Sequence, residues 1–443
     1  MIKQMPKYEC YKDSGEDWIG DVPSHWEVVP IRSIFKFRNE KNDPIITDNI
    51  LSLSIAHGVT EYSEEGRGGN KRKDDLSAYK ITRPGDIVMN SMNVIVGAVG
   101  LSKYFGAISP VYYALYTEHD EAVINYYEKV FQNESFQRGL LKFGKGILIK
   151  LSGTGKLNTI RMKVSTDDLK TLNFPKPPHN EQIAISNYLD GKTAQIDEAI
   201  AIKQKQIELL KERKQIIIQK AVTEGLNPDV PMKDSGVDWI GEIPEHWDAI
   251  KLKHLFKETT SRTKTGEETL LSLRMERGLV PHNEVSDKPI SAENLIDYKM
   301  VEPGQMVMNR MRAAIGIFGI PSQAGLVSPD YAVYNVSQEI VAEFYLLLFK
   351  TQIMGTQFRL ASKGMGTGSS GFMRLYTENF GNIKVPLGPL VEQKEILEKI
   401  EKESSKLNRA IDNLNLSIDK LKEYKTTLIN SAVTGKIKVT ELV

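Results

Sequence analysis

Apolar residues recur along two segments of the chain with the alternating spacing of three and four residues that is typical of a coiled coil. In the first segment the inward positions are Ile196, Ile200, Ile207, Leu210 and Ile217, with Lys203 and Lys214 among them. In the second segment they are Leu407, Ile411, Leu414, Ile418, Leu421 and Leu428. The pattern predicts two long helices that pack against each other along this seam. The alternative is that each amphipathic helix lies on its own globular domain.

The remainder of the chain has a different pattern, with short runs rich in Val, Ile, Leu and Tyr that Gly and Pro interrupt. Runs such as DNILSLSI, GDIVMN and QMVMNRM predict short strands joined by turns, with some helix between them. The prolines of FPKPPHNEQ and VPLGPLVEQ end each strand-rich region and lead into a long helix. The chain is therefore expected to be an α+β protein with strand-rich domains and long helices.

This arrangement is written twice. The stretch KDSGEDWIGDVPSHWEVVPIRSIF at 12–35 returns as KDSGVDWIGEIPEHWDAIKLKHLF at 233–256, and YKITRPGDIVMNSM at 79–92 returns as YKMVEPGQMVMNRM at 298–311. A length of 443 residues suits two such copies better than one core. The copies divide the chain into a first strand-rich domain, a first helix, a second strand-rich domain and a second helix, at 1–179, 180–224, 225–388 and 389–443.

Composition narrows the possible chemistry. No apolar run of 18 residues and no charged-then-apolar leader is present, so a cytoplasmic protein is expected. Cys10 is the single cysteine, and the seven histidines lack the spacing of metal ligands. SGTGKLN at 152–158 lacks the residues of a phosphate-binding loop, and neither an amino-methyltransferase tetrapeptide nor a nuclease signature is present. The sequence predicts a noncatalytic chain.

Although the net charge is only +1, basic residues gather in segments that contain no acid. Residues 138–166 hold seven basic residues and no Asp or Glu. In the second copy, residues 344–376 hold four basic residues and no acid, and residues 303–329 hold Arg310 and Arg312 and no acid. Glycines within both segments would let a backbone approach phosphates closely. A solvated surface that happens to lack acids is the alternative. The candidate phosphate contacts are Lys142, Lys145, Lys150, Lys156, Arg161, Lys163, Arg359, Lys363 and Arg374, with Arg67, Lys71, Arg72 and Lys73 in a basic loop of the first copy.

Four features in a fixed order resemble the DNA specificity subunits of type I restriction-modification systems. They are the opening W-I-G-x-x-P-x-H-W, the run P-G-D-I-V or P-G-Q-M-V, the helix entry P-x-x-E-Q, and the helix end AVTEG or AVTGK. The resemblance covers essentially the whole chain, twice. It implies two pseudo-symmetric target recognition domains, each of which reads one half of a split asymmetric DNA site. It also implies that the two helices form an antiparallel coiled coil that holds these domains apart and sets the spacer.

Duplication then has a purpose, because one chain with pseudo-twofold symmetry can offer equivalent faces to two identical partners while its two reading surfaces differ. Several residues of the repeated opening are expected to be frame residues that seat each domain against the helices. They are Trp18, Trp26, Trp239 and Trp247, with Pro23, Pro244, His25 and His246. Contact with a partner is the alternative for the tryptophans.

The bases should be read where the two copies differ within a common frame. After the strand IVMN the first copy has Ser91 and Asn93, where the second has Arg310 and Arg312. Asn suits adenine and Arg suits guanine in the major groove, each bidentate contact being worth roughly 1 to 3 kcal/mol of discrimination. The alternative is that both arginines hold phosphates, which position the protein without specifying sequence.

The resemblance also implies partners. They are double-stranded DNA, two adenine methyltransferase subunits and motor-nuclease restriction subunits, with no membrane. Cofactors would then lie on the partners, S-adenosylmethionine on the methyltransferase and ATP with magnesium on the restriction subunit, and none on this chain. The alternatives are a related bipartite-site restriction system, an orphan complex that only methylates, an enzyme in its own right, and a coiled-coil scaffold without a DNA role.

Overall fold

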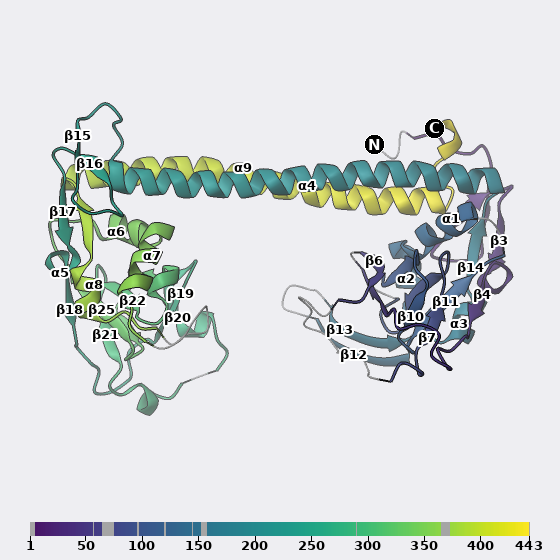
Figure 1. Ribbon diagram of the computed structural model, residues 1–443, viewed down its shortest axis with the longest axis horizontal. Coiled ribbons are helices and arrows are strands. Elements are labelled where there is room, and N and C mark those ends of the chain that lie inside the picture. Colours follow the sequence, from purple (N-terminus) through teal and green to yellow (C-terminus); the bar gives the residue numbers. More distant parts are fainter. Residues whose placement is uncertain are drawn as a thin grey trace. The chain divides into compact units, whose positions relative to one another are not determined.

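The computed structural model describes residues 5–55, 57–63, 75–94, 97–118, 121–143, 145–151, 157–288, 290–364 and 373–442. For residues 121–123, 145–151 and 157–162 this description is of the backbone alone. The chain forms two compact units (Figure 1). The first unit comprises residues 1–203 and 416–443, and the second comprises residues 204–415. The chain passes from one unit to the other only within the two long helices.

The first unit consists of short strands, three short α-helices and a segment of each long helix. Its strands are β1 (Tyr11–Asp13), β2 (Asp21–Pro23), β3 (Glu27–Pro30), β4 (Lys36–Arg38), β5 (Leu51–Ser54), β6 (Gly58–Glu61), β7 (Lys80–Thr82), β8 (Ile87–Asn90), β9 (Val99–Leu101), β10 (Gly106–Ile108), β11 (Tyr112–Tyr116), β12 (Lys145–Leu151), β13 (Leu157–Lys163) and β14 (Asn173–Lys176). Its α-helices are α1 (Glu121–Phe131), α2 (Glu134–Gly139), α3 (Thr166–Thr171) and the beginning of α4 (His179–Glu224).

The second unit repeats this order, except that the hairpin β12-β13 has no counterpart among its described strands. Its strands are β15 (Met232–Asp234), β16 (Glu242–Pro244), β17 (Asp248–Lys251), β18 (Phe256–Thr259), β19 (Leu271–Arg274), β20 (Gly278–Pro281), β21 (Lys299–Val301), β22 (Met306–Asn309), β23 (Phe318–Gly319), β24 (Gly325–Val327), β25 (Tyr331–Val336) and β26 (Lys384–Leu387). Its α-helices are α5 (Leu252–Leu255), α6 (Ala342–Phe349), α7 (Gln352–Ala361), α8 (Thr377–Asn382) and the beginning of α9 (Leu390–Val433).

The two units share one sheet topology. A four-stranded antiparallel sheet has the order β4-β11-β8-β9 in the first unit and β18-β25-β22-β23 in the second. Two-stranded pairs also correspond, for example the hairpin β5-β6 to β19-β20 and the pair β3-β14 to β17-β26. The expected α+β duplication is therefore confirmed, and every shared sheet offers the same frame to residues that differ between the copies.

The repeated P-G motif explains how the central strand of each sheet begins. Gly85 and Gly304 have φ of +90° and +83°, a conformation that side chains disfavour, so a tight turn feeds β8 and β22. All four residues of β8 are buried, as expected for a strand between two neighbours with both faces covered. In Figure 1, α1 and α2 of the first unit and α6 and α7 of the second lie between the strands and the paired long helices.

The long helices run antiparallel within each unit. α4 begins in the first unit and ends in the second, while α9 does the reverse. The predicted inward positions are buried or half-buried along both helices, Ile196, Ile207, Ile418 and Leu428 being buried. The outer face of α4 is more open, since Ile202 is 54% exposed. This burial pattern is the one expected of a coiled-coil seam.

Two lysines at the seam have a polar partner on the opposite helix. The Lys214 ammonium donates to Asn408 Oδ1 at 3.0 Å in the second unit, and Lys425 pairs with Asp197 at 2.7 Å in the first. The alternative prediction, that each helix lies on its own globular domain, applies to the helix ends. Ile185 and Leu189 of α4 are buried in the core of the first unit.

One carboxylate anchors the start of each long helix to the repeated opening motif. Glu181, in the first turn of α4, accepts hydrogen bonds from Trp26 Nε1 (3.0 Å) and the Tyr8 hydroxyl (2.6 Å), and lies 2.6 Å from His25 Nε2. Burial raises the pKa of Tyr8 well above its usual value, and the bond to Glu181 raises it further. A carboxylate in the first helical turn also complements the helix dipole.

The second unit repeats this anchor. Glu392 of α9 accepts a bond from Trp247 Nε1 at 2.9 Å and lies 2.6 Å from His246 Nε2. The predicted frame role of these histidines and tryptophans is confirmed. The glutamate of the P-x-x-E-Q motif thus contacts the histidine and tryptophan of the H-W motif, which explains why both motifs occur in each copy.

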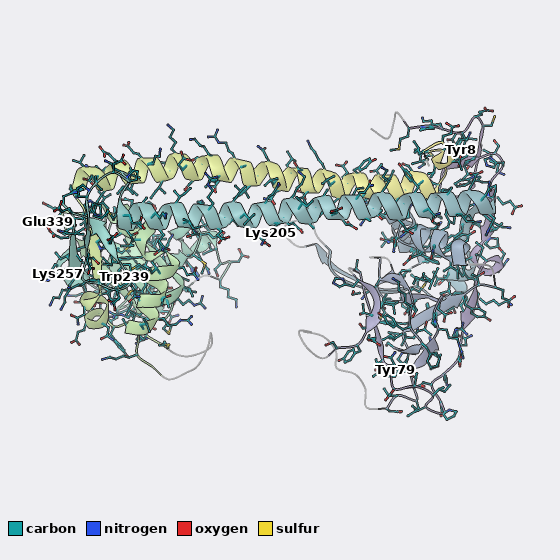
Figure 2. All side chains as sticks on the ribbon, turned by 45° about the horizontal axis from the view of Figure 1, so that its top comes forward. Tyr8, Tyr79, Lys205, Trp239, Lys257 and Glu339 are labelled. Carbon is teal, nitrogen blue, oxygen red and sulfur yellow. The ribbon has the colours of Figure 1, made fainter. Side chains whose placement is uncertain are left out.

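The same tryptophans also contact the C-terminal end of a long helix, Trp247 that of α4 and Trp26 that of α9. Gly225 follows α4 with φ of +80° and packs on Trp247, while Gly435 follows α9 with φ of +72° and packs on Trp26 and Pro23. Glycine in the left-handed region is a common helix ending. Each opening motif therefore clamps the start of one long helix and the end of the other. Figure 2 shows Tyr8 beside the C-terminal part of the chain, where Pro6 O accepts a bond from Lys438 N at 2.8 Å.

Candidate nucleic-acid interface

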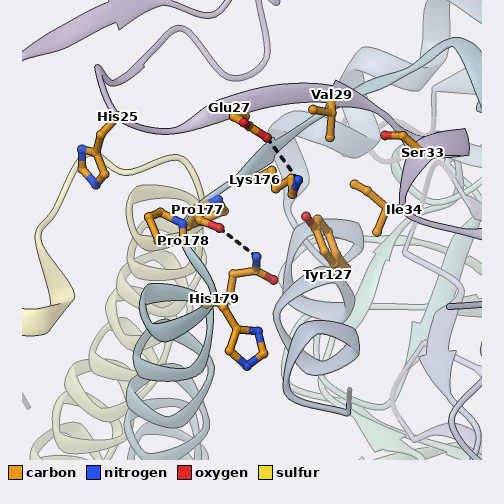
Figure 3. A pocket seen from close by; sticks show the side chains of 11 residues that line it. His25, Glu27, Val29, Ser33, Ile34, Tyr127, Lys176, Pro177, Pro178 and His179 are labelled. Atoms are coloured by element: carbon orange, nitrogen blue, oxygen red, sulfur yellow. Dashed lines mark hydrogen bonds and ion pairs between the residues drawn. The ribbon is translucent and has the colours of Figure 1, made fainter. Parts of the chain in front are cut away.

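The pocket of Figure 3 lies beside the start of α4 and belongs to the frame. Its polar side chains bind one another, Lys176 to Glu27 at 3.1 Å and Gln182 Nε2 to Pro177 O at 2.8 Å. These contacts tie β3, β14 and α4 together. The surfaces that could meet a ligand must therefore be sought in the loops that the frame carries.

The loops after β8 and β22 have the same fold in the two units. Asn90 Oδ1 accepts a bond from Met92 N (3.0 Å), and Asn309 Oδ1 accepts one from Met311 N (3.1 Å). The asparagine of the shared VMN run thus holds the turn in each copy. As a result, the third residue after it, Asn93 or Arg312, is exposed at equivalent places.

The first of the two differing positions points inward in both units. Ser91 is buried, and its hydroxyl donates to Val111 O at 2.7 Å. Arg310 lies 2.6 Å from Glu258 Oε1 and donates to Thr377 Oγ1 at 3.0 Å, and its side chain is only 14% exposed. Ser91 and Arg310 therefore belong to the frame as the structure has them, in contrast to the reading or phosphate roles considered from the sequence.

Glu258 is the centre of this internal cluster. It also accepts a bond from Thr377 and pairs with Lys299 at 3.2 Å. Burial alone would raise the pKa of Glu258, but the Thr377 hydrogen bond and the Arg310 charge outweigh it and hold that pKa below the usual range. Burial lowers the pKa of Lys299 in spite of this carboxylate. The sequence could not reveal the cluster, since its members lie on four separate elements.

The candidate phosphate contacts differ in where they lie and in whether their side chains are described. Arg67, Lys71, Arg72, Lys73 and Lys156 lie outside the described residues, and Lys145, Lys150 and Arg161 lie on β12 and β13, whose backbone alone is described. Lys163 and Lys142 are exposed, and the charge of Lys163 adds to burial in lowering the pKa of Lys80. The backbone of the hairpin β12-β13 pairs Lys145 with Lys163.

In the second unit the candidate phosphate contacts differ in exposure and in ion pairing. Arg359 is exposed and lines a groove between α4 and α7 that also includes Lys350. Lys363 is exposed, and its backbone pairs with that of Arg374. The Arg374 guanidinium lies 2.7 Å from Asp330, an acid from outside the segment that looked free of acids. Arg359 and Lys363 are thus the available cations of this set.

Sequence analysis missed a second place where the copies differ, the tips of the hairpins β5-β6 and β19-β20. The frame residues match, L-S-L before and Gly after, whereas Ser54, Ile55 and His57 stand where the second copy has Arg274, Met275 and Arg277. The signal was present as divergence between two matched blocks. It was overlooked because the tip is not strongly basic.

Among the described residues, no helix has the length and apolar character needed to cross a membrane. Within the same ranges, no group of three His, Cys, Asp or Glu side chains is placed to hold a metal ion.

The structure therefore has a duplicated frame that carries different exposed loops. Comparison with known proteins shows which proteins this chain is similar to. Residues 244–425 match the model of the type I restriction modification DNA specificity domain. Two relatives from Methanocaldococcus jannaschii are similar over nearly their whole length. The putative type I restriction enzyme MjaX specificity subunit is 24% identical over 99% of both chains, and the type I restriction enzyme MjaVIII specificity subunit is 25% identical over 95% of both.

The fold has a solved counterpart. A structure from work on complex assembly and conformational transition of the type I R-M system matches with a TM-score of 0.64 at 13% identity, and the match covers 93% of this chain and 98% of that one. This chain is thus similar to type I restriction enzyme specificity subunits over nearly its whole length, and residues 244–425 match the DNA specificity domain of type I restriction modification. The resemblance inferred from the sequence motifs is thereby confirmed.

Proposed function

We propose that this chain gives a type I restriction-modification complex its sequence specificity by reading a bipartite, asymmetric DNA site. The first unit reads one half-site and the second unit reads the other. The observation that carries this proposal is the pair of equivalent loops at Asn93 and Arg312, which one frame exposes identically but which differ in chemistry. An amide and a guanidinium in equivalent places suit different base edges.

The partners we propose are two adenine methyltransferase subunits and, for cleavage, motor-nuclease restriction subunits. The two clamps at Glu181 and Glu392 support this, because they build the same helix junction twice and so can offer one docking face to two identical partners. The methyltransferase would extrude the target adenine from the duplex. S-adenosylmethionine would lie on that partner, ATP and magnesium on the restriction subunit, and no cofactor on this chain. We propose that the complex acts in the cytoplasm.

Sequencing of methylated DNA tests the proposal. Cells that express the methyltransferase partner with this chain should carry N6-methyladenine at one two-part motif, and cells that express the partner alone should lack it. Methylation at the same motif in the absence of this chain would contradict the proposal. Methylation without nuclease activity would identify a complex that only methylates.

A further inference from the structure

The tips of the hairpins β5-β6 and β19-β20 differ between the copies although the hairpins themselves do not. Ser54 pairs with Gly58 at the end of the first hairpin, and Arg274 pairs with Gly278 at the end of the second. Gly58 and Gly278 have φ of +61° and +67°, so the two turns close in the same way. The two hairpin tips therefore have different side chains on a similar backbone, so the groups they offer to a ligand can differ without a change in backbone position.

Packing fixes each hairpin beside the loop that carries Asn93 or Arg312. A Cβ atom on Gly100 of β9 would lie 2.9 Å from Gly58 Cα, so strand and turn are in direct contact in the first unit. In the second unit the equivalent Gly319 of β23 abuts Leu273 and Leu279 of the hairpin. Both strands, β9 and β23, directly follow the loops in question. Each unit therefore packs one divergent hairpin against the strand that follows the other divergent loop.

The core of the second unit keeps this arrangement rigid. Leu271, Leu273 and Leu279 of the hairpin are buried in one cluster with Val307 of β22 and with Ile317, where the Arg312 loop ends. Because the hairpin and the loop share this cluster, the tip cannot shift independently of Arg312.

The side chains of the tip stand in solvent. Met275 is 50% exposed and its counterpart Ile55 is 64% exposed, so both apolar side chains are accessible to a ligand. Arg274 is exposed with no salt bridge among the described residues, while Arg277 lies 2.6 Å from Glu284. The tip also carries the acid Glu276.

We propose that these tips are a second reading element of each unit, and that Arg274 and Met275 contact base edges of the half-site read by the second unit. The inference rests on the proposed function. A mixed set of cation, apolar group and acid is unsuited to phosphates, which an acid would repel, but it fits base edges. Arg pairs with guanine, an apolar side chain meets the thymine methyl group, and a carboxylate accepts from cytosine.

The test transfers three residues of the first tip to the second unit, with Glu276 kept, in the full-length chain expressed with its methyltransferase partner. The variant Arg274→Ser, Met275→Ile, Arg277→His places side chains of the first copy on the second hairpin. Methylated-DNA sequencing should show a changed base preference at one or more positions of the second half-site and none in the first. Methylation of the parent site should fall about tenfold or more.

A matched control is Lys257→Ala. Lys257 is an exposed cation of β18, at the opposite edge of the same sheet from β23, and is labelled in Figure 2. Its motif should be that of the parent. The single change Arg274→Lys keeps the charge but loses the bidentate fork, so it should weaken the parent site about as much as Arg274→Ala does.

Three results would count against the inference or its basis. An unchanged motif from the triple variant would overturn the reading role of the tip and leave the proposed function intact. Uniform loss of methylation over all sequences, restored by Arg274→Lys, would make Arg274 a phosphate contact. Failure of the parent chain itself to direct methylation to any motif would refute the proposed function, and this inference with it.

Discussion

At the scale of single residues, two arginines that are two positions apart have different environments. The environment of each indicates whether it stabilises the unit or is available to contact DNA. Arg310 is held by Glu258 and Thr377 inside the second unit, whereas Arg312 is exposed on the same loop. The sequence offered both as readers, because the ion-pair partner Glu258 lies 52 residues away along the chain.

The substitutions Arg310→Ala and Arg312→Ala should therefore have opposite signatures. Arg310→Ala leaves a mostly buried carboxylate with fewer partners and should lower the free energy of unfolding by about 2 kcal/mol. Arg312→Ala should leave unfolding unchanged and relax or weaken only the second half-site. Denaturant unfolding and methylated-DNA sequencing of both variants check this. Equal loss of stability in the two variants would contradict the assignment.

The Glu258 cluster should also make stability depend on pH. A carboxyl group whose pKa is lower in the folded state binds fewer protons there than in the unfolded chain, so its stabilisation is complete above the unfolded value of about 4.3. That contribution should be lost as the pH falls through the folded pKa. Unfolding midpoints measured from pH 7 to pH 3 should fall at the acid end in the parent, and by less in Arg310→Ala. A steeper acid loss in the variant would contradict the account.

The clamp at Glu181 makes a further prediction at this scale. Glu181→Ala removes the acceptor of Trp26 Nε1 and of the Tyr8 hydroxyl, both buried, and should cost about 3 kcal/mol of unfolding free energy. The matched control is Glu208→Ala on the same helix, where the carboxylate pairs with the exposed Lys205 and with no other described cation. Its unfolding should equal that of the parent. Denaturant unfolding of both variants measures the difference, and a Glu181→Ala chain as stable as the control would mean that the clamp does not hold α4.

At the scale of elements, the long helices were the most predictable part of the chain. Their seam follows from the spacing of apolar residues alone, because a period near 3.5 requires a partner helix. The sequence predicted that these domains are rich in short strands, but not which strands pair with one another. Nothing in the local pattern says that β8 lies between β11 and β9, since those contacts join segments distant in sequence.

If the helices set the distance between half-sites, their length should set the number of unread base pairs. Insertion of one heptad near Lys203, in register with the seam, adds about 10 Å of helix. At about 3.4 Å per base pair this allows up to roughly 3 additional base pairs, and fewer if α9 does not follow. The half-sites should stay as they are, because neither loop has moved relative to its own unit. Sequencing of methylated DNA gives the spacer directly. A variant that methylates with the parent spacer would show that the coil is no ruler.

For the whole molecule, duplication explains which residues could be found by reading the sequence. Comparing the copies located Asn93 and Arg312, because a conserved frame around a changed residue is visible without a structure. It did not show that Ser91 and Arg310 turn inward, since inward and outward positions of a turn look alike in sequence. Nor did it show that the hairpin tips lie beside these loops, which is a consequence of packing between β9 or β23 and the hairpins.

The central claim is that each unit reads one half-site on its own. The most direct measurement replaces residues 232–387 by residues 11–176, so that both clamps hold a copy of the first strand-rich domain, and maps methylated adenines with the partner present. Since the clamp motifs match, the account predicts a symmetric motif made of the first half-site twice, in opposite orientations. A chimera that folds and methylates the parent asymmetric site would contradict it.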